Sequence, residues 1–214
     1  MKKLFWEDPY AFRNETLFET VKGREVELRE SVFYAFSGGQ ESDSGTINDI
    51  PVTKAEKSGP SILYTLAADH PFKAGDPAVV VIDGERRKLL IRLHFAAEIV
   101  LWLFMQTFPG IEKIGAHISP TKARLDFLLP ESISPVLPAI RTAAEDLILR
   151  DLPVISAFRD EQAERRYWEV PGFGSLPCGG THPRSTAEVG GIRLARNNIG
   201  RGKERVEITL VSCA

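Results

Sequence analysis

The chain has 214 residues, of which 43% are hydrophobic and 26% charged, the balance expected of a globular protein. Its formal net charge of -2 excludes a broadly basic nucleic-acid coat, so any contact with nucleic acid has to come from local groups of Lys and Arg. The two cysteines, Cys178 and Cys213, form no disulfide framework and indicate a reducing compartment, so a cytoplasmic protein is expected.

The first part of the chain is expected to be β-structure. Four short strands are predicted, at residues 26–30, 31–36, 61–67 and 78–82. Residues 37–45 form a glycine-rich loop between the second and third of these strands. Because many short strands separated by turns are typical of a small barrel or sandwich, we assign residues 1–85 to a β-barrel-like domain.

The pattern changes after Gly84. Residues 86–106 contain no Gly or Pro and are rich in Leu, Ile and Ala, which predicts a long helix. Its most apolar stretch, residues 93–105, is too short to span a bilayer, so we expect a core helix and no membrane contact.

The remaining elements are predicted in chain order. They are strands at 114–118 and 123–129, a helix from Ser134 as N-cap to Pro153, a strand at 154–158, a short helix at 160–166, and a hairpin of strands 189–195 and 205–210. This order predicts an α+β fold, in which residues 86–214 form a domain with helices packed on an antiparallel sheet.

His94 and Glu98 stand one turn apart on one face of the long predicted helix. Their neighbours are nearly all apolar, which indicates a buried helix whose polar groups need partners. A local ion pair between the two would satisfy them without any further function.

A second pair lies in Cys178-Gly-Gly-Thr-His182, where glycines allow both side chains to turn towards one point. Thiolate and imidazole are preferred zinc ligands, although a short Cys–His spacing also arises by chance. Together, the two pairs predict either a four-ligand site or a three-ligand site with an open position. Sulfur and nitrogen donors favour Zn²⁺ over Mg²⁺.

These motifs resemble the editing domain of alanyl-tRNA synthetases and the free-standing AlaX-type trans-editing proteins. The editing domain of threonyl-tRNA synthetases shares the pattern more distantly. The resemblance extends over residues 25–210 and includes the glycine-rich residues 33–45, the interior segments 115–118 and 123–127, and the terminal segments 186–190 and 202–210.

The chain departs from the family pattern at Glu98, because the first motif of the family is His-x-x-x-His. A carboxylate oxygen can ligate zinc, but it makes the site more negative than a neutral imidazole does. Alternatively, Glu98 is a general base beside an open coordination position, or the site has lost its activity. Phe95 also replaces a small polar residue of the family, which predicts a narrower or drier pocket.

The resemblance implies zinc-dependent hydrolysis of misacylated tRNA, with Ser- or Gly-tRNA(Ala) as the expected substrate. The catalytic residues that the resemblance implies are Gln40 and Asp43 of the glycine-rich loop, together with Glu98. The substrate-binding residues that it implies are Gly38, Gly39 and Gln40 of this loop, together with Thr181. The metal ligands on this reading are His94, Glu98, Cys178 and His182.

Basic residues gather at 193–205, and Arg193, Arg201 and Lys203 are the predicted contacts to the acceptor end of tRNA. A second basic group is Arg86-Arg-Lys88. Either group could equally be a solvated surface. Two other functions are compatible with the sequence: a non-catalytic module that binds tRNA or a partner through a structural or degenerate metal site, and a hydrolase of another small ester or amide.

Overall fold

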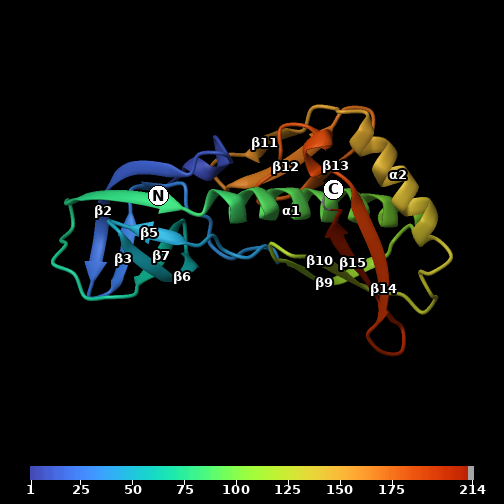
Figure 1. The fold of residues 1–214 in the computed structure, drawn as a ribbon, viewed down its shortest axis with the longest axis horizontal. Coiled ribbons are helices and arrows are strands. Elements are labelled where there is room, and N and C mark those ends of the chain that lie inside the picture. The colour runs from blue at the N-terminus through green and yellow to red at the C-terminus, as the bar shows by residue number, and fades with distance from the viewer. Residues whose placement is uncertain (212–214) are drawn as a thin grey trace. The chain divides into compact units, whose positions relative to one another are not determined.

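The computed structural model describes residues 1–211, so Cys213 lies outside the described residues. The chain divides into two compact units (Figure 1). The first comprises residues 1–37 and 41–88, and the second comprises residues 38–40 and the chain from residue 89 onward. Both strands and helices are present, which confirms the predicted α+β class.

The first unit is built around a six-stranded barrel with the strand order β2-β3-β7-β6-β5-β8, closed by pairing of β8 with β2. Alternating side chains point into it, as in β7, where Ile62, Tyr64 and Leu66 are buried. The elements of this unit are β1 (Lys2–Lys3), a short 3-10 helix (Leu4–Trp6), β2 (Arg13–Lys22), β3 (Glu25–Leu28), β4 (Glu30–Ser31), β5 (Gly45–Ile47), β6 (Ile50–Ser58), β7 (Ser61–Leu66) and β8 (Pro77–Ile82).

The strand predicted at residues 31–36 is wrong beyond Ser31, although residues 32–35 are buried. Side chains satisfy the backbone there in place of a neighbouring strand. The N–H of Val32 donates to Asn14 Oδ1 (3.0 Å) and that of Tyr34 to Asp43 Oδ2 (2.7 Å). An apolar, β-prone sequence therefore packs in the core without joining the sheet.

A buried ion pair between Arg87 and Asp43 anchors this segment within the first unit. Both side chains are completely buried, and Arg87 Nε donates to Asp43 Oδ1 at 2.8 Å while its Nη2 contacts Asp43 Oδ2. Arg87 also donates to the carbonyls of Val32 (2.6 Å) and Pro9 (3.0 Å). Because every charge and polar group here has a partner, the pair is tolerated in an apolar interior.

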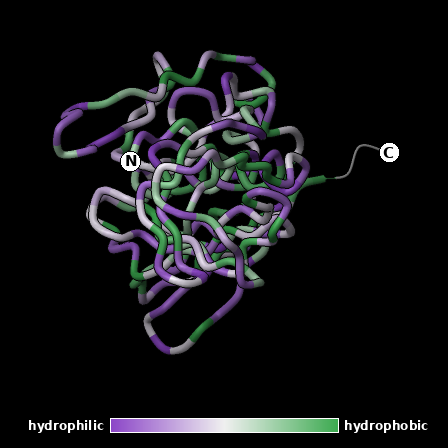
Figure 2. Tube along the Cα trace, turned by 90° about the vertical axis from the view of Figure 1, so that its left-hand side faces the viewer, coloured by the Kyte–Doolittle hydropathy of each residue, from purple (hydrophilic) through white to green (hydrophobic). Residues whose placement is uncertain are grey.

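The second unit contains two antiparallel sheets, of strand order β14-β15-β10-β9 and β11-β12-β13. Its core joins residues of α1, α2 and both sheets, among them Phe95, Phe127, Ile140 and Trp168. Hydrophilic segments are frequent in the loops that project from the trace of the chain (Figure 2). Its elements are α1 (Gly84–Thr107, shared with the first unit), β9 (Glu112–Ile118), β10 (Ala123–Leu128), α2 (Leu137–Leu149), β11 (Ile155–Asp160), β12 (Arg165–Val170), β13 (Gly174–Pro177), a 3-10 helix (Thr186–Val189), β14 (Ile192–Asn198) and β15 (Lys203–Leu210).

The long predicted helix is confirmed as α1, which begins two residues earlier than expected. Asp83 explains the start, because its Oδ1 accepts the N–H of Arg86 at 3.0 Å in the manner of an N-cap. At 24 residues, α1 is long and apolar enough to cross a membrane by length and composition, but 61% of its most apolar window is buried within the protein.

Two other predictions for this part of the chain are wrong. Helix α2 begins at Leu137 with Val136 as N-cap, because residues 133–136 form a preceding turn. Residues 161–164 are a hairpin turn between β11 and β12, not a helix, with Glu164 at φ 51° and Asp160 Oδ1 accepting the N–H of Ala163. Helix-prone charged residues are overridden there by pairing of the flanking strands.

Replacing Asp43 with Asn tests the buried ion pair. The change leaves Arg87 as an uncompensated buried cation, so we expect a loss of about 3 kcal/mol in the free energy of unfolding, measured by urea denaturation. Glu85→Gln is the matched control, because its pair with Lys88 is exposed and contributes at most about 0.5 kcal/mol. Equal effects of the two substitutions would contradict a stabilising role for the buried pair.

Candidate metal centre

His94 lies at the centre of the buried part of α1. The residues on either side of it, Leu93 and Phe95, are completely buried, and His94 itself is 3% exposed. Burial lowers the pKa of His94, opposed in part by the Glu98 carboxylate. The neutral imidazole directs Nε2 at the sulfur of Cys178, 3.1 Å away.

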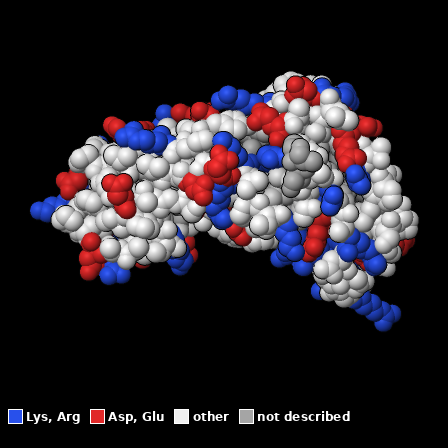
Figure 3. Space-filling view, in the orientation of Figure 1, with Lys and Arg blue, Asp and Glu red and all other residues white. Residues whose placement is uncertain are grey.

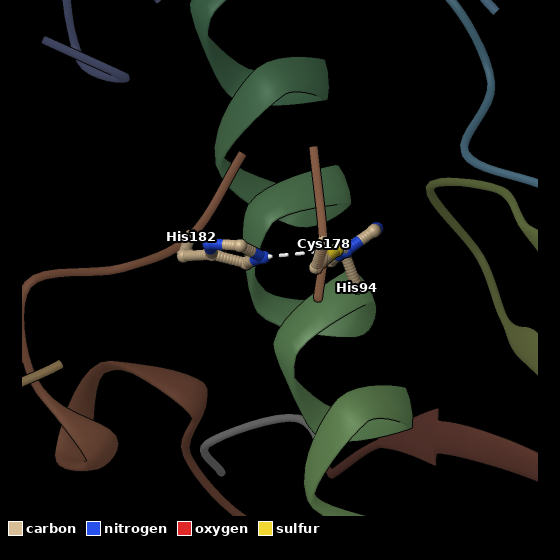
Figure 4. Close-up of side chains that lie close together, drawn as sticks. All are labelled: His94, Cys178 and His182. Atoms are coloured by element: carbon tan, nitrogen blue, oxygen red, sulfur yellow. Dashed lines mark hydrogen bonds between the residues drawn. The ribbon is translucent and has the colours of Figure 1, made fainter. Parts of the chain in front are cut away.

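The loop after β13 supplies the other two donors (Figure 4). The N–H of Cys178 still pairs with the carbonyl of Arg166 (3.0 Å), and two glycines then turn the chain so that His182 faces back. His182 Nε2 is 3.3 Å from Cys178 Sγ. The donor atoms of His94, Cys178 and His182 all lie within 4.8 Å of one another.

Gln40 fastens this loop from the opposite side. Its Nε2 donates to Thr181 Oγ1 (3.0 Å) and its Oε1 accepts the N–H of Thr181 (3.3 Å). Gly39, at φ +89°, brings Gln40 there: its carbonyl accepts the N–H of Ile118 (2.7 Å), and a Cβ on it would lie 2.7 Å from the carbonyl oxygen of Ala116. This approach explains one of the predicted glycines, whereas Gly38 has open space around it.

Two strands of the smaller sheet support the cluster. Ser156 on β11 and Trp168 on β12 are register partners. The Ser156 hydroxyl hydrogen-bonds Nδ1 of His182 (2.9 Å), and the Trp168 indole N–H donates to Glu98 Oε2 (2.7 Å). Neither residue belongs to a sequence motif, and nothing in the local sequence marks Ser156 or Trp168 as part of the site.

Glu98 lies beside the cluster but is not one of the three residues whose donor atoms all group together. Its Oε1 is 3.7 Å from both His94 Nε2 and Cys178 Sγ. Phe95, one turn earlier, packs against the rings of Trp168 and His182 at centroid distances of 5.4 and 5.8 Å. Because it is completely buried, Phe95 forms part of the wall behind His182.

The electrostatics of the cluster favour a bound cation. Burial raises the pKa of the Cys178 thiol, and the nearby Glu98 carboxylate raises it further. Burial also lowers the pKa of His182 well below its usual value, helped by His94 and Arg166. Both imidazoles are therefore neutral donors, and a divalent cation is the partner that would stabilise the thiolate.

The donor set fits zinc. One sulfur and two nitrogens converge, and the Ser156 bond to His182 is the outer support that a metal-ligating imidazole usually has. His94 Nδ1 is buried and finds no hydrogen-bond partner among residues 1–211. If Nε2 binds the metal, the ring proton is on Nδ1, so His94 differs from His182, whose Nδ1 is held by Ser156.

Asp43 and Gln40 are placed in different units, despite their proximity in sequence. Both oxygens of Asp43 are engaged by Arg87 and by the N–H of Tyr34 within the first unit. The contacts of Asp43 are therefore those of a buried ion pair within the first unit.

Basic side chains gather over the β14–β15 hairpin (Figure 3). Arg193, Arg201 and Lys203 are exposed and form no ion pair with residues in the described part of the chain, whereas Arg196 and Arg205 pair with Glu204 and Asp126. The second basic group differs from the hairpin, since its three members all pair with carboxylates. These pairs are Arg86 with Glu41, Arg87 with Asp43 and Lys88 with Glu85.

Sequence comparisons confirm the resemblance that the motifs predicted. The chain is 28% identical to the alanyl-tRNA editing protein AlaX-M of Pyrococcus horikoshii, over 98% of its own length and 97% of that protein. It is 32% identical to an alanine–tRNA ligase of Methanopyrus kandleri over 85% of its length and 30% identical to that of Korarchaeum cryptofilum over 97%. It spans only 22% and 26% of those two ligases. No family model matches the sequence.

Replacing Gly180 with Ala tests the geometry of the cluster. A Cβ at residue 180 would lie 2.5 Å from His94 Nε2 and 3.0 Å from Gln40 Oε1, so the imidazole must move. We expect zinc affinity, measured by competition with a chromophoric chelator, to fall by at least about 10-fold. Gly179→Ala is the matched control, because a Cβ there meets nothing within 4 Å. Equal affinities of the two variants would contradict the proposed convergence of ligands.

Proposed function

We propose that this chain hydrolyses the ester bond of misacylated tRNA, with Ser- or Gly-tRNA(Ala) as substrate. The observation that carries the proposal is the convergence of His94, Cys178 and His182 in a chain similar along its length to an alanyl-tRNA editing protein. Its remaining relatives reported above are alanine–tRNA ligases, which supports tRNA(Ala) as the partner. A protein that acts on tRNA and has a free thiol at Cys178 would be located in the cytoplasm, where thiols stay reduced.

His94, Cys178 and His182 would hold Zn²⁺. A zinc ion held there would supply Lewis-acid chemistry by polarising the ester carbonyl, on whose oxygen negative charge develops during hydrolysis. The protein supplies two neutral imidazoles held in fixed orientations, one of them by Ser156. Glu98 is the additional acidic group of the site and faces it with Oε1.

The contacts of Gln40 support a positioning role. The amide nitrogen of Gln40 donates to Thr181 Oγ1, and its amide oxygen accepts the N–H of Thr181. Gln40 therefore holds the loop that carries Cys178 and His182 and takes no direct part in the reaction. Gly39 lets the chain approach the loop, where Thr181 donates its N–H to Gln40 Oε1 and accepts from Gln40 Nε2, while Gly38 supplies a turn residue at φ +61°. We likewise propose that Asp43 stabilises the first unit and takes no part in catalysis.

The proposed roles of the two parts of the chain follow the domain boundaries predicted from the sequence. We propose that residues 1–85 form the barrel-like domain with the glycine-rich motif, and that residues 86–214 form the zinc-binding editing domain. Within the latter, Arg193, Arg201 and Lys203 on the hairpin would contact phosphates near the acceptor end, because their charges are exposed and unpaired by residues 1–211.

Replacing Cys178 with Ala tests the catalytic proposal. Loss of the sulfur donor of the His94–Cys178–His182 cluster should remove stoichiometric zinc and reduce deacylation of Ser-tRNA(Ala) and Gly-tRNA(Ala) by at least about 100-fold. Metal content is measured by mass spectrometry and hydrolysis by release of labelled amino acid. Wild-type protein that has been stripped by a chelator and reloaded with Zn²⁺ is the control, and it should recover activity. Undiminished hydrolysis by Cys178→Ala would refute the metal-dependent mechanism.

Replacing both Arg201 and Lys203 with Gln tests the hairpin. If each meets a phosphate, the double variant should bind tRNA more weakly, and the dependence of log binding constant on log salt should become shallower by about 2. Lys57→Gln is the control, since Lys57 is an exposed cation on β6 of the other unit. Binding measured by filter retention at several salt concentrations gives the slope. An unchanged slope in the double variant would exclude these residues as phosphate contacts.

A further inference from the structure

One pair of opposed residues on β11 and β12 supports two sides of the metal centre. Ser156 and Trp168 are register partners, so their side chains leave the sheet on the same face. Ser156 bonds His182, which belongs to the ligand cluster, whereas Trp168 bonds Glu98, which does not. The strand pair thereby holds the His182 imidazole through Ser156 and the Glu98 carboxylate through Trp168.

The Trp168–Glu98 hydrogen bond divides the two carboxylate oxygens by role. Indole N–H can only donate, so at 2.7 Å it fixes Oε2 as its acceptor. Oε1 is left facing the cluster, 3.7 Å from both His94 Nε2 and Cys178 Sγ. Trp168 is itself immobilised, because it is completely buried and Phe95 packs edge-on against it at 5.4 Å.

We propose that Trp168 is a positioning residue that holds Glu98 beside the ligand set and outside it, with Oε1 as a fixed hydrogen-bond acceptor for the water that attacks the ester. This inference rests on the proposed hydrolytic function. The pair Glu98–Trp168 takes the place of the second histidine of the related motif. It exchanges a metal ligand for an oriented acceptor.

The donor-only character of the indole makes the proposal testable. In Glu98→Gln, the amide oxygen must turn to Trp168 and its NH₂ group then faces the cluster, which replaces an acceptor with a donor. In the double variant Glu98→Gln/Trp168→Phe, the amide is free to reverse and present its oxygen again. A residue that only fills space would show additive losses, whereas a positioning residue gives a double variant at least as active as Glu98→Gln.

The experiment combines Co²⁺ absorption spectra with steady-state kinetics on Ser-tRNA(Ala). We expect Glu98→Gln to lower kcat roughly 100-fold and Trp168→Phe roughly 10-fold, with KM little changed in both. The double variant should be no slower than Glu98→Gln. The Co²⁺ bands and zinc stoichiometry should be those of the wild type in all three, since no ligand is altered. Trp102→Phe is the matched control. Trp102 lies on α1, the helix that carries Glu98, and its indole packs against Phe173, so this substitution should leave kcat unchanged.

Three results would overturn the inference. Shifted Co²⁺ bands in Glu98→Gln, or zinc affinity reduced by 10-fold or more, would make Glu98 a ligand. Additive losses in the double variant would make Trp168 a packing residue. Wild-type protein that binds neither Co²⁺ nor Zn²⁺ would refute the proposed function and this inference together, whereas the first two results refute the inference alone and leave the proposed function intact.

Discussion

A single buried imidazole sets the requirements for the second unit. His94 sits in a turn of α1 whose neighbours are completely buried, so its polar nitrogen atoms cannot reach water. The loop that follows β13 has to come within hydrogen-bonding distance of the helix, and it does so by placing Cys178 3.1 Å from Nε2. Gly180 allows this approach because it has no Cβ to meet the imidazole. The convergence of His94, Cys178 and His182 thus also gives the buried imidazole a partner within the packed interior.

Hydrogen bonds from three neighbouring residues fix the orientation of side chains and backbone in and beside the cluster. Gln40 fixes the loop through both amide atoms, and Ser156 fixes one imidazole. Trp168 fixes the carboxylate of Glu98 by its one N–H. Such outer contacts orient donors and set their basicity, so they decide whether a set of ligand residues is also a reactive site. In this protein they come from the register of one strand pair and from Gln40, which is 141 residues away in sequence from Thr181 in the loop that it holds.

The sequence predicted the elements whose signal is local. The apolar pattern around His94 predicted the helix α1, and alternation within residues 205–210 predicted the last strand, β15. Predictions failed where a distant group changed the local preference. Residues 31–36 are β-prone, but Asn14 and Asp43 take the hydrogen bonds that a strand would use. Residues 161–164 favour a helix but form a turn because the strands on each side pair with each other.

By itself, the sequence determined the chemistry of the donors: a thiol and two imidazoles, on a helix and on a glycine-containing loop, with a carboxylate in place of a further histidine. The type of each side chain and its spacing from its neighbours along the chain can be read from the sequence, so predicting these donors requires no knowledge of distant contacts. Only the tertiary structure decided that Glu98 stands beside the cluster, that Asp43 belongs to a buried ion pair, and that Trp168 faces the carboxylate. These facts depend on strand register and on burial, which arise when segments far apart in the chain pack together.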